Sequence, residues 1–460
     1  MRMTEPEIGL TQAISAYQNG KRGEALRISR VILVNEPENA GAHYVLGVVQ
    51  ADAGELAEAL LALQRAVSLA PKNVNFHITL GNLYLMLERE VAATRTFRQA
   101  IALAPNSAPA HVNLATTLKR QGRLEEAVTE FRTALDLLRG SIWRRPSITE
   151  ATTDPSQDET FCFASRAKLE HDIEQYEYLL SRDALPPDFE PEIAAHREVL
   201  AELNEAEGSG DPARRRALSL DQQARLAGSF NRLNYLPPDT NSTIEVLNPE
   251  LDYDSMARQF KVAAPPVIVV DDLLSEIALA ALRRFCLEAT IWFDCKEHGG
   301  YLGAYMNEGF DTPLLFTLAR QLEKRLPNIF GGHPLVQMWA FKYGARSDGT
   351  RIHADKAAIN FNFWITPDVA LENKEFGGLR LYDMAAPPKW RFEDYNLQET
   401  ALRAEIKRCN TPFRDIPYKC NRAVIFDSSL IHETIPLRFQ NGYENRRINV
   451  TMLFGERAEG

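Results

Sequence analysis

The feature that most constrains this chain of 460 residues is a period of 34 residues in its first third. Prolines, alanines and small residues all recur at that interval. The recurring sets are Pro37, Pro71 and Pro105; Ala25, Ala59, Ala93 and Ala127; and Gly47, Gly81 and Ala115. Small residues allow two helices to approach closely, and a proline stops a helix. The period therefore predicts a row of helix pairs that stack on one another.

The cleanest copy of the unit runs from Val74 to Pro105. In this pattern the chain resembles the tetratricopeptide repeat family over about residues 6–140, with three clear copies and a degenerate one before Pro37. The resemblance implies a curved α-solenoid whose groove takes a peptide or partner protein. Groove positions by the family's pattern are Tyr44, Val48, Asn82, Met86, Thr116, Lys119 and Arg120. The alternative is an array that serves only as a dimerisation or packing surface.

Three histidines, His43, His77 and His111, follow the same interval. A row of imidazoles suggests metal ligation, but successive repeats place their residues on different turns of a superhelix. Each histidine also falls at a packing position of the first helix of its unit. We therefore expect them to have a structural role.

Composition excludes several classes of protein. Hydrophobic residues at 45% and charged residues at 25% are typical of a folded globular chain, and the net charge of −10 disfavours nucleic acid as a partner. No apolar run approaches the ~18 residues of a membrane helix, and the first residues lack the apolar core of a signal peptide. Five cysteines without a C-x-x-C pair favour a reducing compartment. We expect a cytoplasmic protein without a membrane partner.

The chain divides by pattern into three regions: a repeat solenoid at 1–140, a helical linker region at 141–245 and a strand-rich domain at 246–460. The linker region contains a proline-rich stretch, Pro146–Asp158, and helices whose charged runs read as solvated faces. It carries no recognisable chemistry. The expected architecture is thus a multidomain α + β protein.

Short β-branched or alternating runs, bounded by glycine, proline and aspartate, dominate the last region. The predicted strands are Val267–Val270, Val336–Tyr343, Ala358–Ile365, Gly378–Tyr382, Arg422–Phe426 and Arg447–Phe454. Strands at this density predict a β-sandwich or an open barrel.

Metal-binding residue types occur at the ends of these strands. His353 and Asp355 lie two apart between two predicted strands, and His432 ends another. Two histidines and one carboxylate leave open positions on an octahedral metal, the arrangement of non-haem Fe(II) oxygenases. Arg447 opens the last strand, where a guanidinium can clamp a distal carboxylate through two hydrogen bonds.

In the order of these motifs the chain resembles the 2-oxoglutarate- and Fe(II)-dependent oxygenases over about residues 262–456, especially prolyl-hydroxylase-like and phytanoyl-type members. The resemblance implies a double-stranded β-helix (jelly-roll) barrel in which His353, Asp355 and His432 hold iron. It implies that Arg447 binds the 5-carboxylate of 2-oxoglutarate, with Arg446 as the fallback if the strand phase differs by one. Further cofactor-binding candidates are Tyr343, Asn360, Asn362 and Asn449, the last standing where family members often have serine.

The leading hypothesis is an Fe(II)- and 2-oxoglutarate-dependent dioxygenase, acting as a hydroxylase with O2 as co-substrate and ascorbate as a supporting reductant. Its repeats would recruit a partner or substrate, and the insert Pro367–Tyr418 would cover the metal as a lid that sets specificity. Two alternatives are a non-catalytic repeat-based scaffold with a silent barrel and a cupin-like metalloenzyme that uses no 2-oxo acid. The intact ligand set disfavours the first, and Arg447 disfavours the second.

Overall fold

A computed structural model of the chain describes residues 5–140, 159–207, 210–238, 244–387, 390, 392–396 and 398–457. The chain divides into two compact units, Met1–Leu138 and Arg139–Gly460, here called unit 1 and unit 2. Residues 159–238 thus belong to the same unit as the strands, instead of forming a separate linker domain. The predicted stretch Pro146–Asp158 lies outside the described residues. Among the helices of the described ranges, none is long and apolar enough to cross a membrane.

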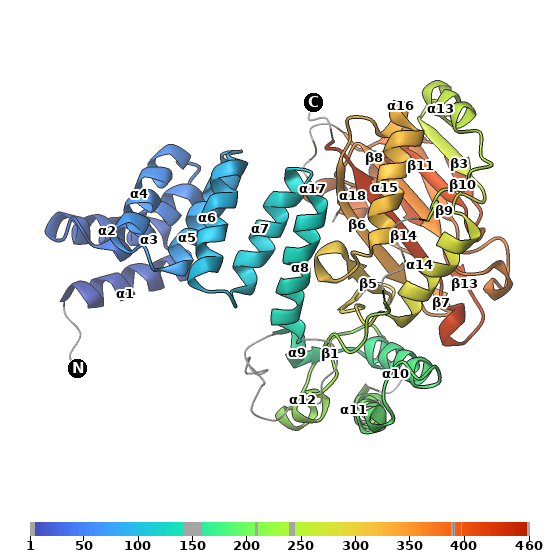
Figure 1. Cartoon of the computed structure of the whole chain (residues 1–460), viewed down its shortest axis with the longest axis horizontal. Coiled ribbons are helices and arrows are strands. Elements are labelled where there is room, and N and C mark those ends of the chain that lie inside the picture. Colours follow the sequence, from blue (N-terminus) through green and yellow to red (C-terminus); the bar gives the residue numbers. More distant parts are fainter. Residues whose placement is uncertain are drawn as a thin grey trace. The chain divides into compact units, whose positions relative to one another are not determined.

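Unit 1 is a row of antiparallel helix pairs (Figure 1). Its helices are α1 (Glu5–Gln18), α2 (Arg22–Asn35), α3 (Ala40–Asp52), α4 (Leu56–Leu69), α5 (Val74–Met86), α6 (Glu90–Leu103), α7 (Ala108–Arg120) and α8 (Leu124–Arg139). The degenerate first copy therefore forms a helix pair as well. Pro37, Pro71 and Pro105 each follow directly after the C-cap of a second helix, where they prevent its continuation.

The repeating small residues lie where paired helices touch. A Cβ atom on Gly81 would stand 2.5 Å from the ring of Phe97, and one on Gly47 would stand 2.7 Å from Leu63. Both distances are below van der Waals contact, so only glycine allows this approach. Ala59, Ala93 and Ala127, on the facing helices, are almost fully buried.

The recurring histidines have a structural role, as predicted. The Nε2 atoms of His43, His77 and His111 lie 2.8–2.9 Å from the carbonyl oxygens of Pro37, Pro71 and Pro105. Each imidazole therefore ties the start of one helix pair to the turn that precedes it. Histidine and proline recur together because they form this one contact.

Unit 2 contains two antiparallel sheets with helices on their outer faces. The larger sheet has seven strands in the order β3-β11-β8-β14-β6-β5-β4, and the smaller has three in the order β10-β9-β12. Those strands are β3 (Val267–Val270), β4 (Asp294–Cys295), β5 (Leu302–Tyr305), β6 (Leu335–Lys342), β8 (Ile359–Trp364), β9 (Leu379–Ala385), β10 (Phe413–Ile416), β11 (Ala423–Asp427), β12 (Leu430–Thr434) and β14 (Ile448–Phe454). A short pair, β7 (Arg346–Ser347) and β13 (Leu437–Arg438), stands apart.

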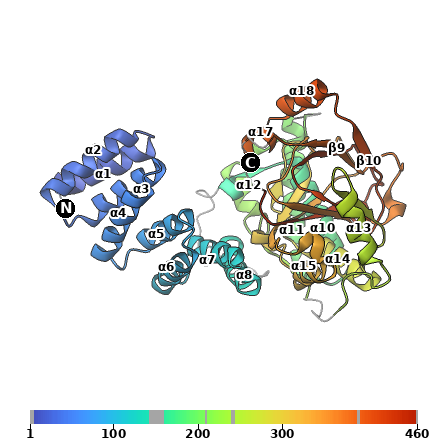
Figure 2. The same ribbon diagram turned by 90° about the horizontal axis from the view of Figure 1, so that it is seen from above.

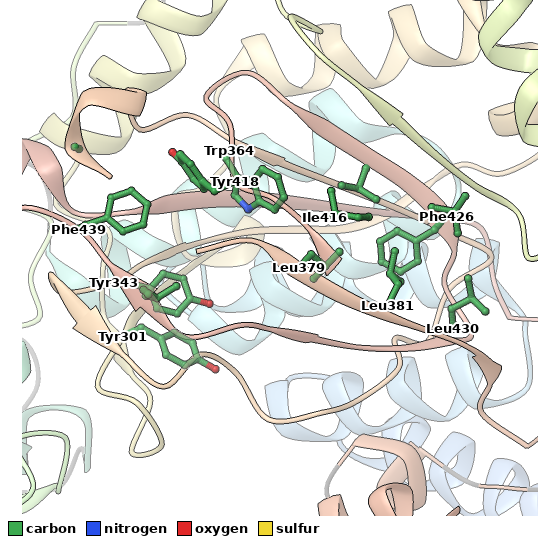
Figure 3. Packing of buried hydrophobic residues seen from close by; sticks show 14 residues of the cluster. Tyr301, Tyr343, Trp364, Leu379, Leu381, Ile416, Tyr418, Phe426, Leu430 and Phe439 are labelled. Carbon is green, nitrogen blue, oxygen red and sulfur yellow. The ribbon is translucent and has the colours of Figure 1, made fainter. Parts of the chain in front are cut away.

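The two sheets pack face to face around one hydrophobic cluster (Figure 3). Trp364, Val424 and Phe426 come from the larger sheet, and Leu379 and Leu430 come from the smaller. The described strands thus form a two-layered antiparallel β region, which agrees with the predicted sandwich. The strand pairings of the described residues do not close either sheet into a barrel.

Helices cover the outer faces of both sheets. Figures 1 and 2 show α14 (Glu276–Glu288) and α15 (Pro313–Arg325) on the side of the larger sheet, and α17 (Phe392–Asn396) and α18 (Glu399–Cys409) on the side of the smaller. Phe330, in α16 (Pro327–Phe330), packs on Phe454 with ring centroids 4.8 Å apart. The remaining helix of the β-rich region is α13 (Tyr253–Val262).

The helices of the predicted linker region pack on this β structure. They are α9 (Glu159–Cys162), α10 (Arg166–Leu180), α11 (Glu190–Glu207) and α12 (Leu220–Leu226), with a small strand pair, β1 (Phe163–Ala164) and β2 (Arg216–Ala217). On α10, Gln175 donates hydrogen bonds to the carbonyls of Leu287 and Ala289, and Glu174 pairs with Arg446 at 2.6 Å. The described part of the predicted linker region therefore packs on the β-rich domain and does not act only as a linker.

Candidate metal centre

The three predicted metal ligands come together in space. One ligand atom each of His353, Asp355 and His432 lies within 4.8 Å of the others. His432 Nε2 is 3.5 Å and His353 Nε2 is 4.0 Å from the Asp355 carboxylate, and the two imidazole centroids are 4.4 Å apart. Within the described residues, this is the one group of three or more such side chains close enough to share a metal ion.

Backbone pairing explains the meeting of residues so distant in sequence. His353 and His432 form an isolated antiparallel bridge, in which each amide donates to the other's carbonyl at 2.9 and 2.8 Å. The Asp355 amide donates to the carbonyl of Ser428, in the turn before β12. Each ligand is therefore fixed through its own main chain.

Hydrogen bonds also set the tautomers of the two imidazoles. The Nδ1 atom of His353 lies 2.7 Å from the Arg351 carbonyl, and that of His432 lies 2.9 Å from the Leu430 carbonyl. A carbonyl only accepts, so each Nδ1 carries the hydrogen and each Nε2 keeps its lone pair. The second nitrogen of a metal-bound histidine has this kind of partner in metal sites.

The charges suit a divalent cation. Burial and the neighbouring His432 lower the pKa of His353, which keeps that imidazole neutral. Burial alone would raise the pKa of Asp355, but the neighbouring imidazoles of His432 and His353 and the hydrogen bond from the Asn360 amide outweigh burial, and the pKa is lowered. The centre thus offers two imidazole nitrogens and one carboxylate, the set typical of a facial triad.

Asn360 and Asn362 lie on the same face of β8, since side chains alternate along a strand. The Asn360 Nδ2 atom donates to Asp355 at 2.7 Å, so this residue orients the carboxylate. Asn362 stands opposite Thr451 in the register of β8 with β14. The side-chain oxygens of both asparagines are buried without a hydrogen-bond partner. Such acceptors are costly unless a ligand or water satisfies them.

The polar row continues along β14 to Arg447, which is almost fully buried. Its guanidinium donates to the carbonyl of Gly377 at 2.9 Å and to the Asn449 side chain at 3.1 Å. Asn449 in turn donates to Thr451 at 3.3 Å, so the asparagine is itself held while its oxygen supports the guanidinium. The ring centroid of Tyr343 lies 5.0 Å from Cζ. In the described part of the chain, no carboxylate pairs with Arg447.

Arg446 and Glu433 lie away from this row. Arg446 forms an ion pair with Glu174 on α10, and because it already has an anionic partner the structure favours Arg447 over this fallback. Glu433 is buried on the face of β12 opposite to His432, where Tyr382 and Arg403 bind it at 2.6 and 2.9 Å. The sequence placed Glu433 next to a ligand but did not reveal these partners.

The described part of the insert does not form the predicted lid. Its strands β9 and β10 build the smaller sheet, and α18 packs on the outer face of that sheet through Leu402. The His353 side chain remains 23% exposed, so solvent reaches the centre from its side.

The predicted groove residues lie on the first helices of the repeats. Tyr44 of α3 stacks on Phe76 of α5 with ring centroids 4.6 Å apart and bonds to Thr79, which links two repeats. Asn82, Met86 and Arg120 are exposed. Burial and the neighbouring Arg120 lower the pKa of Lys119 to about 8.

Comparison with known proteins identifies the repeats. Two family models described as tetratricopeptide repeat match residues 10–74 and 96–129. The N-terminal region therefore carries tetratricopeptide repeats, as its period predicts. The chain matches no curated protein sequence.

Several solved structures are similar to part of the chain. MamA is 24% identical over 29% of this chain and 78% of its own, with a TM-score of 0.28. YrrB, described as a TPR protein with an unusual peptide-binding site, is 22% identical over 28% of this chain and 67% of its own, with a TM-score of 0.27. TTC0263, a thermophilic TPR protein in Thermus thermophilus, is 24% identical over 29% and 75%, with a TM-score of 0.27.

Proposed function

We propose that unit 2 is an Fe(II)- and 2-oxoglutarate-dependent oxygenase acting as a hydroxylase, and that the repeats of unit 1 recruit a peptide or protein partner. One observation carries the proposal. Two imidazoles and a carboxylate converge at one point, and the row of polar side chains beside them ends at a buried guanidinium without a carboxylate partner among the described residues.

The residues present fit both absent groups. His353, Asp355 and His432 would hold Fe(II), because two imidazole nitrogens and one carboxylate leave positions for further ligands. Arg447 would bind the far carboxylate of 2-oxoglutarate, since an unpaired buried guanidinium is stabilised by an anion. Asn362, whose oxygen lacks a partner in the described structure, lies between the two ends of the row.

When bound, the metal and co-substrate supply an oxidation in which 2-oxoglutarate and O2 give succinate and CO2 while a substrate C–H bond becomes C–OH. The chain's own residues position the reactants. Asn360 holds the Asp355 carboxylate, the carbonyls of Arg351 and Leu430 hold the imidazoles, and Asn449 holds the guanidinium. Buried aromatic rings around Arg447 keep water away from the diacid site.

We also propose that the two packed sheets form the double-stranded β-helix, or jelly roll, of that enzyme class. Antiparallel pairing throughout, and the bridge that joins the loop before β8 to β12, support this topology. Recruitment by unit 1 is supported by its repeats, since stacked helix pairs offer an extended concave surface to a partner.

The test uses the purified full chain with Fe(II), 2-oxoglutarate and ascorbate. The wild-type protein should form succinate, and His353→Ala should abolish it. Succinate that is unaffected by His353→Ala would overturn the proposal. A protein that binds metal but neither binds 2-oxoglutarate nor forms succinate would favour the cupin-like alternative, and one that binds neither would favour a scaffold.

A further inference from the structure

The helices of the insert lie against the residues that flank the metal ligands. Ile352 and Ala354, on either side of His353, and Ile431, beside His432, belong to a second hydrophobic cluster. That cluster also contains Tyr395 of α17 and Leu402 of α18, and it is separate from the hydrophobic cluster between the two sheets. Each ligand thus points to the centre while its neighbours point into the packing of α17 and α18.

Hydrogen bonds reinforce this contact at the residue between two ligands. The Ala354 amide donates to the Tyr395 carbonyl at 3.1 Å, and the Asn396 side chain donates to the Ala354 carbonyl at 3.2 Å. Both main-chain groups of Ala354 are therefore held by α17. The segment Ile352–Asp355 has no long strand pairing of its own, since its one bridge in the described structure is at His353.

A third contact joins α18 to the strand of the remaining ligand. Arg403 donates to Glu433 at 2.9 Å, and Glu433 follows His432 on β12. The Glu433 side chain is only 11% exposed, and the Tyr382 hydroxyl also bonds to it at 2.6 Å. Two helices of the insert, α17 and α18, therefore together contact the chain next to all three ligands.

We propose that α17 and α18 are the buttress of the metal centre, with Asn396 and Arg403 as positioning residues that fix the spacing of His353, Asp355 and His432. This inference rests on the proposed function, because it concerns the metal site of that enzyme. Residues around the ligands of a metal site set the metal affinity because they hold the ligands in position. Their loss typically weakens metal binding by about 10- to 100-fold.

The experiment titrates the metal-free full chain with Co(II), whose visible absorption reports the number and geometry of its ligands. We expect Asn396→Ala to weaken Co(II) binding about tenfold and to change the shape of the absorption band. Arg403→Ala should weaken it by a smaller factor, because Arg403 is half exposed. The matched control is Arg408→Ala on the same helix, where an exposed arginine pairs with Glu405 and should leave the affinity unchanged.

Thermal unfolding of the same metal-free variants separates positioning from general stability. A merely structural role for the insert would lower the melting temperature of Asn396→Ala but leave the Co(II) affinity and spectrum of the folded protein as in the wild type, and that result would overturn the inference alone. A wild-type chain that binds no Co(II), or binds it equally well as His353→Ala, would overturn the metal site of the proposed function, and the buttress with it.

Discussion

Two adjacent arginines illustrate how much depends on the phase of a single strand. Arg446 and Arg447 point to opposite sides of the backbone just before β14 begins. Arg446 meets Glu174, whereas Arg447 enters the space between the sheets and meets only neutral groups of the described residues. A buried charge without a counter-charge lowers the stability of the folded state, and this is the reason for proposing an anionic ligand at Arg447.

Replacing Arg447 by methionine should therefore have opposite effects on binding and on stability. The apparent dissociation constant for 2-oxoglutarate should rise about 100-fold, the equivalent of about 3 kcal/mol for a lost charged pair. The ligand-free melting temperature should stay the same or rise, because the guanidinium no longer has to be desolvated. Calorimetric titration and thermal unfolding measure the two effects.

Arg446→Met is the control, because it removes an ion pair at the other side of the backbone. It should leave 2-oxoglutarate binding unchanged. Equal losses of binding in the two variants would refute the role given to Arg447.

The sequence predicted the ligand triad because histidine and aspartate at strand ends form a recognisable pattern. It left open which arginine faces inward, since that depends on the register of β14 with β8, a tertiary property. Asn396 and Arg403 were not predicted at all. Their contacts with Ala354 and Glu433 join parts of the chain far apart in sequence, and neither residue belongs to a motif.

At the level of elements, helix pairs with a fixed period were predictable because each unit repeats the same contact. Position 81 requires glycine because the Phe97 ring occupies the space that a larger side chain would need. Gly23, in α2, has nothing within 4 Å of the position of a Cβ atom. These two glycines allow a direct comparison.

Gly81→Ala should destabilise unit 1 by about 1–3 kcal/mol, because the added methyl group overlaps a packed ring. Gly23→Ala should be neutral or slightly stabilising, since alanine has the higher helix propensity. Denaturation followed by far-ultraviolet circular dichroism measures the change. All five tryptophans follow residue 138, so tryptophan fluorescence reports unit 2 alone and should not shift. Similar losses in both variants would argue against the close helix contact.

The position of α10 could not be predicted, and its composition explains why. Its charged run reads as a solvated face, yet Lys168, His171 and Asp172 are all buried. Lys168 and Asp172 satisfy each other as an ion pair one turn apart, which makes the burial of both tolerable. Charge patterns predict exposure only where partners are lacking, and here the partners lie on the same helix.

On the scale of the whole molecule, the proposed recruitment and the proposed oxidation are assigned to separate compact units. The three candidate metal ligands and Arg447 all belong to unit 2, and so do all the residues described above that hold them. The described residues of unit 1 add the repeats but no ligand of the centre.

A chain limited to residues 139–460 should therefore bind Co(II) with an affinity within about twofold of the full chain, because every described contact of the centre is retained. Residues 1–138 alone should keep their helical circular dichroism. Titration of the first fragment and spectra of the second provide the measurement. Loss of metal binding in fragment 139–460 would show that unit 1 contributes to the centre.

The bridge between His353 and His432 has a consequence for the order of events during synthesis of the protein. Its two halves are far apart in the chain, so His432 must leave the ribosome before the three candidate ligands can form the site. Under the proposed function, iron binds late, after the fold is complete. A chain whose synthesis stops before β12 has only two of the three ligands. Iron scarcity would act as a shortage of folded protein as well as of catalyst, because a ligand that binds only the native state draws molecules into it.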